Sequence, residues 1–190
     1  GGPTREKPFT IQVHSSAVAE AARQALDAPT PQVGLEQLRT YLASHHDPRE
    51  DSFIQSSMAE LYLRVVPPDS EAAAKAAKVA MELAQSAEER HRALYVQATV
   101  LQFQGRIEEA RHQIQAAFED DGISLAGLKL ATLEGLLDEQ AGDTPAAEKA
   151  YKRVMNHALS LADQHPEEAL NNYRLAALKL ARLYRCLLYT

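Results

Sequence analysis

The sequence predicts an all-α fold in which about nine helices stack as antiparallel pairs in a helical repeat array. An apolar fraction of 45% in 190 residues is typical of a folded protein, and the composition favours helix because Ala, Leu, Glu, Gln and Arg dominate. A unit of helix, glycine turn and helix recurs after 37 residues, from Gly105 to Gly142. Only residues 9–13 show a short alternation of the kind that is typical of a strand.

The repeat is defined by small and large residues at matching places in two consecutive segments. Small residues let two helix axes approach closely, and the neighbouring helix pair covers the apolar residues that remain. The matching residues are Leu94, Ala98, Leu101, Gly105, Ala110, Ile114 and Ala117 in the first segment, and Ala131, Gly135, Asp138, Gly142, Ala147, Tyr151 and Val154 in the second. Repeat arrays present extended surfaces to other proteins, so binding is the first functional expectation.

The first half of the chain is expected to hold four helices. Residues 1–13 carry Pro3 and Pro8 and are interpreted as an N-terminal tail or arm, which leaves residues 14–190 for one helical repeat domain. Pro29 and Pro67 end two of the helices, because proline lacks an amide donor and disfavours helix in the residue before it. The four expected helices cover about residues 15–28, 31–44, 49–66 and 70–84.

The second half is expected to hold five helices, at about residues 87–104, 107–119, 124–141, 144–163 and 167–190. Ser86 and Glu89 form a capping-box pattern, in which the serine accepts a backbone amide and the acid reaches back. Pro145 falls in a first helical turn, where its missing donor costs nothing. The last helix is followed by no partner helix, so we expect a fragment of a longer array or a last helix covered by another protein or copy.

Composition also limits the class of function. The net charge of −6 argues against general nucleic-acid binding. Cys186 is the single cysteine, which excludes an intramolecular disulfide and a zinc site of several cysteines, and we expect it to be a buried thiol. No apolar run is long enough for a transmembrane helix. One cysteine fits a reducing compartment, so we expect a cytoplasmic protein, with the periplasm as the alternative.

Two groups of residues resemble parts of metal sites, but we expect neither to bind metal. His45, His46 and Asp47 are consecutive in a loop, whereas ligands of a transition metal must converge on one point. Glu88 and His91 match half of a di-iron site, and the sequence has no second half. Catalytic motifs and phosphate-binding loops are also missing, so we expect no enzymatic activity and no metal or cofactor.

The pattern in residues 91–122 resembles the tetratricopeptide (TPR) family, which places small residues at the helix crossings and a glycine between the helices. Gln97 stands where a large apolar residue is usual, and Gly122 replaces the closing proline. The second unit departs from the family at Asp138, where tyrosine is usual. The resemblance covers about residues 50–190. It implies a right-handed α-solenoid that acts as a non-catalytic scaffold or adaptor.

The resemblance also implies a concave groove lined by the first helix of each pair. The paired Lys and Asn residues that hold chaperone tails in some family members are missing, so we do not expect such a clamp. Tyr95, Val96 and Phe103 instead favour an apolar or helical segment of a partner, unless they pack against the neighbouring pair. The expected groove residues are Phe53, Ser57, Glu60, Arg64, Arg92, Tyr95, Val96, Thr99, Gln102, Phe103, Lys129, Thr132 and Leu136.

Charge is distributed unevenly along the chain. Residues 106–150 are strongly acidic, whereas the last expected helix carries a basic patch made of Arg174, Lys179, Arg182 and Arg185. Such a contrast favours electrostatic selection of a partner or self-association through the C-terminal helix. The alternative function is a regulatory or sensor module of a longer protein, acting through oligomerisation or ligand binding, and a helical-bundle metalloenzyme comes third.

Overall fold

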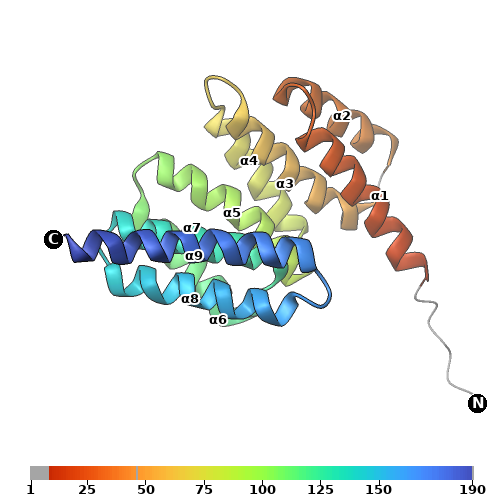
Figure 1. Ribbon diagram of the computed structural model, residues 1–190. Helices are drawn as coiled ribbons and strands as arrows, with labels where there is room; N and C mark the ends of the chain where they lie inside the picture. Colours follow the sequence, from red (N-terminus) through yellow and green to blue (C-terminus); the bar gives the residue numbers. More distant parts are fainter. Residues whose placement is uncertain (1–8, 46, 190) are drawn as a thin grey trace, which may run out of the picture. The chain divides into compact units, whose positions relative to one another are not determined.

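The computed structural model describes residues 9–45 and 47–189, with the backbone alone for residues 9–16, 48 and 49. Within them it confirms the predicted all-α fold, with nine helices and no strand (Figure 1). None of these helices has both the length and the apolarity that a membrane crossing requires. The helices are α1 (Phe9–Leu26), α2 (Pro31–Ser44), α3 (Pro48–Arg64), α4 (Ser70–Leu83), α5 (Ala87–Phe103), α6 (Ile107–Asp121), α7 (Leu125–Gln140), α8 (Thr144–Leu161) and α9 (Pro166–Leu188).

The helices form two compact units, divided in the sequence between Leu83 and Ala84. The N-terminal unit holds α1 to α4, and the C-terminal unit holds α5 to α9. A single repeat domain over residues 14–190 therefore stays a prediction, and each unit is described by itself.

The tail expected at residues 1–13 needs a correction, because α1 begins at Phe9 and not near Ser15. Residues 1–8 lie outside the described part of the chain. A helix pairs its own backbone donors and acceptors, whereas a short strand at residues 9–13 would need a partner strand. The alternation in that segment is therefore part of a helix. The ends of α2 to α9 fall within two residues of those expected.

In the N-terminal unit, α3 contacts each of the other three helices. Leu38 on α2 and Ile54 and Leu61 on α3 are almost fully buried at the centre of its core. Helix α4 presents a row of small buried residues, Ala73, Ala76, Ala77 and Ala80. Small side chains allow close packing on α3, where the buried Ser52 hydroxyl donates to the Ala80 carbonyl at 2.8 Å. This unit therefore combines a leucine-rich side with an alanine-rich side.

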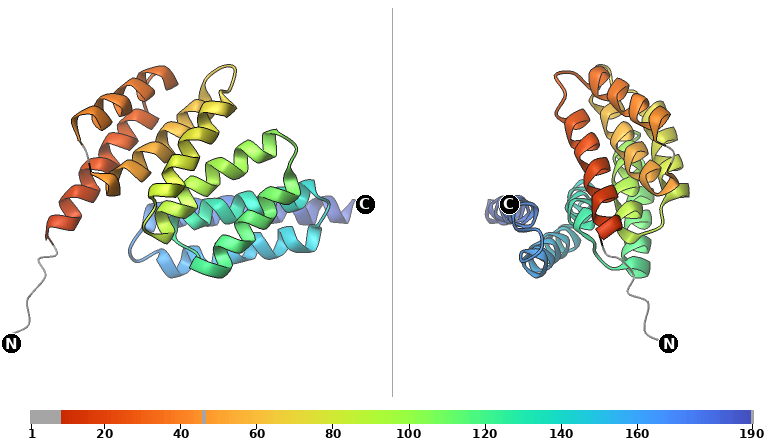
Figure 2. Two further views of the ribbon diagram at one scale, coloured as in Figure 1. Left: turned by 180° about the vertical axis from the view of Figure 1, so that it is seen from behind. Right: turned by 90° about the vertical axis from the view of Figure 1, so that its right-hand side faces the viewer.

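In the C-terminal unit, α7 contacts α5, α6, α8 and α9, and α9 lies alongside α8 (Figure 2). The first helix of each pair thus packs on its own partner and on the first helix of the next pair. Helix α7 is so enclosed that Lys129 and Gln140 are its only exposed residues. Helix α9 packs mainly on α8 and less on α7, so the solenoid arrangement stays a prediction.

The two glycine turns have the same backbone geometry. Gly105 and Gly142 have φ angles of 74° and 78°, a left-handed conformation that glycine adopts without steric cost. After each, the next amide donates back across the turn: Arg106 to the Leu101 carbonyl at 2.9 Å, and Asp143 to the Asp138 carbonyl at 2.8 Å. Both turns are therefore Schellman motifs, and the recurrence after 37 residues is confirmed for these turns.

The cap predicted at Ser86 is partly confirmed. The Ser86 hydroxyl accepts the Glu89 amide at 3.2 Å and so satisfies one of the unpaired donors at the start of α5. The Glu89 carboxylate, however, accepts the amide of Gln85 at 2.6 Å and not that of Ser86. In a capping box the acid would accept the amide of the N-cap residue, Ser86. Here the Glu89 carboxylate accepts the amide of the residue before it instead.

Candidate partner-binding surface

Several of the expected groove residues meet on one accessible side of α5 and α7. The Lys129 ammonium lies 4.3 Å from the centre of the Tyr95 ring, a distance typical of a cation–π contact. At the C-terminal ends of both helices, the Gln102 amide donates to the Gln140 side chain at 3.1 Å. Phe103 follows Gln102 and is 60% exposed. We name this the α5–α7 surface; it consists of Tyr95, Gln102, Phe103, Lys129, Leu136 and Gln140.

Three expected groove residues do not lie on an accessible surface. Val96 is buried in the C-terminal unit. Thr132 is also buried, and its hydroxyl donates to the Leu128 carbonyl one turn earlier at 3.0 Å. In the N-terminal unit, Ser57 is buried and its hydroxyl donates to the Phe53 carbonyl at 3.0 Å. These three residues therefore pack inside the units and do not line a groove.

The expected groove residues on α3 support the N-terminal unit itself. Phe53 packs against the core of that unit. Arg64 pairs with Glu60 at 2.6 Å and also donates to the carbonyl of Leu26, the last residue of α1, at 2.9 Å. A cation at the end of a helix satisfies carbonyls that lack partners within the helix. Arg64 therefore holds α1 to α3.

On α5, Arg92 pairs with Glu88 at 3.2 Å, and the Thr99 hydroxyl donates to the Tyr95 carbonyl at 2.7 Å. Both residues are half-buried. Each of these two contacts joins residues one turn apart on α5, where such pairs are close neighbours. They order the part of α5 beside the α5–α7 surface.

Sequence reasoning missed a polar cluster inside the C-terminal unit. Glu134 on α7 is buried and pairs with Arg153 on α8, whose guanidinium lies 4.9 Å from the centre of the Phe118 ring on α6. Asp138, one turn further along α7, is buried and pairs with Arg111 at 2.6 Å. Burial raises the pKa of both carboxyl groups. The available signal was a pair of acids one turn apart, Glu134 and Asp138, in a helix whose residues are mostly apolar.

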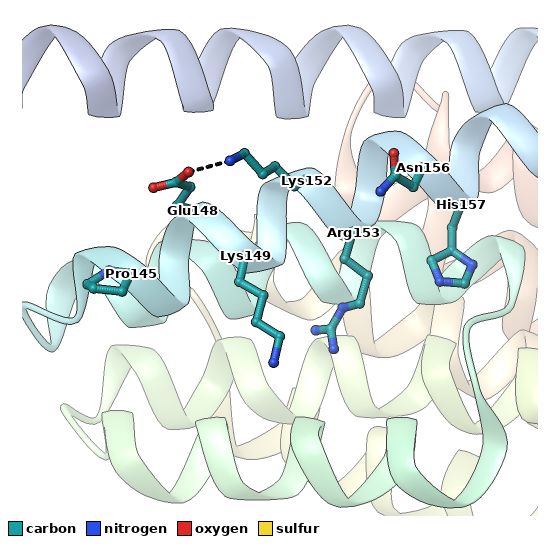
Figure 3. A pocket seen from close by; sticks show the side chains of 7 residues that line it. All are labelled: Pro145, Glu148, Lys149, Lys152, Arg153, Asn156 and His157. Atoms are coloured by element: carbon teal, nitrogen blue, oxygen red, sulfur yellow. Dashed lines mark hydrogen bonds and ion pairs between the residues drawn. The ribbon is translucent and has the colours of Figure 1, made fainter.

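Two pockets lie near this cluster. One is lined by side chains of α8 alone, with the pair Glu148–Lys152 on one side and Lys149 and Arg153 on the other (Figure 3). The second lies between α6, α7 and α8, and is lined by Gln115, Phe118, Glu119, Glu134, Asp138, Ala146, Lys149, Ala150 and Arg153. Acidic and basic groups are mixed in it, so it does not select a ligand of one charge.

The two groups that resemble metal half-sites have structural contacts. Glu88 accepts the amide of Ala126 at 2.8 Å, and the ring of the buried His91 lies 2.8 Å from the hydroxyl of Ser124, which caps α7. Both residues thus connect the start of α5 to the start of α7. In the loop after α2, His45 stacks on Tyr41 with 4.3 Å between ring centres. His46 lies outside the described residues.

The buried His91 predicts a pH dependence of stability. Burial lowers its pKa below the ordinary value of 6.5, so the folded chain keeps it neutral while the unfolded chain takes up a proton. Stability should therefore decline as the pH falls below 6.5, by at most about 1.4 kcal/mol per pH unit from this group. Denaturant unfolding from pH 7.5 to 5 should show a steeper decline for the parent than for His91→Gln. The exposed His112→Gln serves as control, and parallel curves for all three proteins would contradict the assignment.

Helix α9 has one buried and one exposed side. Ala169, Ala176, Leu180 and Leu183 are buried against the unit. The opposite side, which we name the α9 outer face, consists of Leu170, Arg174, Leu175, Leu178, Arg182 and Arg185, all of them exposed. Three residues of the predicted basic patch thus share this face, whereas Lys179 is half-buried. Cys186 is exposed and not buried as expected, because the buried side of α9 ends at Leu183.

No protein-family model matches this chain, and neither a curated protein nor a solved structure matches it. Any functional conclusion therefore rests on the chain's own surfaces.

Proposed function

We propose that this protein is a non-catalytic scaffold or adaptor that binds a peptide or helical segment of a partner protein. The observation that carries the proposal is the α5–α7 surface, where side chains from two helices meet at an accessible place. The pairs Lys129–Tyr95 and Gln102–Gln140 bridge the helices. The resemblance to TPR repeats supports the same conclusion, because such arrays bind partners on the first helices of their pairs.

The chemistry of this surface favours a segment with an apolar residue beside polar groups. Phe103 and the half-buried Leu136 offer apolar area. The two glutamine side chains offer donors and acceptors for a peptide backbone or a polar side chain. Aromatic residues are common among the residues that dominate binding energy at interfaces. We therefore propose that Phe103, assisted by Tyr95, is the main contact for the bound segment.

Replacing Tyr95 and Phe103 together with alanine should weaken binding by at least about tenfold while the chain stays folded. The measurement is selection of binders from a random peptide display library on the parent chain, followed by affinities of the enriched peptides for parent and variant. Leu159→Ala is the matched control, because Leu159 is an exposed apolar residue on α8, in the same unit. Peptides that bind the double variant as tightly as the parent would overturn the proposal.

A further inference from the structure

We propose that the α9 outer face is a second binding site, which takes an acidic amphipathic helix of another protein. The proposal stands on different residues from the α5–α7 surface. The first observation is exposed apolar area: Leu178 is 70% exposed, and Leu170 and Leu175 are each more than 40% exposed. Leucine side chains gain free energy when they leave water, so a row of three on one helix is suited to a helical partner.

The second observation concerns the arginines between these leucines. Arg174 and Arg182 lie one turn before and one turn after Leu178, so guanidinium groups border the most exposed apolar side chain on both sides. Among the described residues, no carboxylate lies within ion-pair distance of Arg174, Arg182 or Arg185.

The other arginines of the C-terminal unit behave differently. Arg90 pairs with Asp121, Arg92 with Glu88, Arg106 with Glu109, Arg111 with Asp138 and Arg153 with Glu134. Every arginine of α5, α6 and α8 thus has a carboxylate partner within the unit, and the exceptions share one face of α9. A partner with carboxylates beside an apolar stripe would supply these missing pairs.

Charge also decides between this partner and a second copy of the chain. Two copies of the α9 outer face placed together would bring arginines close to arginines, because the face carries three of them, whereas the exposed acids of α9, Glu167 and Glu168, are confined to its first turn. Like charges opposed across an interface are unfavourable. The 23 residues of α9 span about 34 Å, enough for contact with a helix of about six turns. An acidic helix therefore fits this face better than its own copy.

The experiment uses three synthetic peptides of about six helical turns. The first has a leucine stripe flanked by glutamates, the second has lysines in place of the glutamates, and the third has the first composition in scrambled order. Affinity is measured by fluorescence anisotropy at low and moderate salt. We expect the acidic amphipathic peptide to bind and the other two to bind at least about tenfold more weakly.

Variants locate the site. Arg174→Glu/Arg182→Glu and, separately, Leu178→Asp should each weaken the acidic peptide by about tenfold or more, and circular dichroism checks that they fold. Arg106→Glu is the control for charge, since Arg106 is exposed at the N-cap of α6. Tyr95→Ala/Phe103→Ala should leave this affinity unchanged, which separates a failure here from a failure of the α5–α7 surface.

Several outcomes would overturn the proposal. No binding of the acidic peptide to the parent, equal binding of the lysine or scrambled peptide, or unchanged affinity in both α9 variants would each do so. Light scattering tests for one more contradicting outcome. If the parent chain is a dimer and Leu178→Asp is a monomer, the α9 outer face would be a self-association surface.

Discussion

Replacing Arg111 with methionine should lower the free energy of unfolding of the C-terminal unit by about 3–5 kcal/mol. The Arg111 side chain is 13% exposed and pairs with three carboxylates: Asp138 at 2.6 Å, Asp143 at 2.9 Å and Glu108 at 2.9 Å. The Asp138 side chain is only 2% exposed. Methionine keeps most of the length of arginine but leaves Asp138 as a buried acid without its cation, which is the costly way to break a buried pair.

The arginine also connects three helices. It lies on α6, Asp138 lies on α7, and Asp143 caps α8 by accepting the Ala146 amide at 3.1 Å. Loss of Arg111 should therefore loosen both the packing of α6 on α7 and the start of α8. Hydrogen exchange should show faster exchange of amides in these helices, while amides of the N-terminal unit keep their rates.

Two controls isolate the buried pair. Arg106→Met removes an exposed arginine from the same helix region, and its cost should stay below about 1 kcal/mol. The double variant Arg111→Met/Asp138→Asn should cost less than the sum of its single variants, because asparagine removes the uncompensated charge.

The loss of stability caused by Arg111→Met should also become smaller at low pH. Burial raises the pKa of Asp138, so its protonation in the folded state removes the unpaired buried charge. A loss below about 1 kcal/mol at pH 7 would contradict a central role for this cluster.

The pairing of Arg111 with Asp138 could not be predicted from the sequence. Asp138 was recognised as a departure from the repeat, at a place where tyrosine is usual. Its partner Arg111 is 27 residues earlier, and the contact exists because α6 packs on α7. A sequence pattern records which residues share a face of one helix. It does not record which charged groups of two different helices approach each other.

The helices themselves were predictable because their boundaries depend on local chemistry. Pro31 and Pro145 lie in first turns, Ser86 and Ser124 cap helices, and Gly105 takes the left-handed conformation after a last turn. Each signal acts within a few residues of its own position. The start of α1 was predicted too late because Ser15 or Ser16 was interpreted as its N-cap, whereas the helix begins at Phe9 and continues through both serines.

The candidate surfaces were predictable in part for the same reason. Tyr95 and Phe103 lie on one side of α5 by helix periodicity, and the structure brings Lys129 to the Tyr95 ring. The burial of Val96 and Thr132 depends on how closely the helices of the unit pack around α5 and α7, which no local pattern records. Likewise, the sequence identified the arginines of α9 as basic, but it does not record that no carboxylate of the described residues pairs with Arg174, Arg182 or Arg185, which is a property of the folded unit.

Replacing Gly34 with alanine should destabilise the N-terminal unit by about 1–3 kcal/mol. In an exposed helix the same change stabilises by up to about 1 kcal/mol, because alanine is the better helix former. At Gly34, however, an added Cβ atom would lie 2.2 Å from the backbone carbonyl oxygen of Ala25 on α1 and 3.0 Å from a methyl group of Leu61 on α3. A backbone atom cannot rotate away, so α1 and α2 would have to separate.

The sign of the effect therefore tests the packing of these two helices directly. Denaturant unfolding followed by circular dichroism gives the change in stability, and hydrogen exchange should localise it to the N-terminal unit. Gln37→Ala is the matched control, because Gln37 is exposed on the same helix and its replacement should change stability by less than about 0.5 kcal/mol. If Gly34→Ala were stabilising, the close approach of α1 and α2 would be wrong, and Gly34 would be a conformational weakness and not the residue that permits the contact.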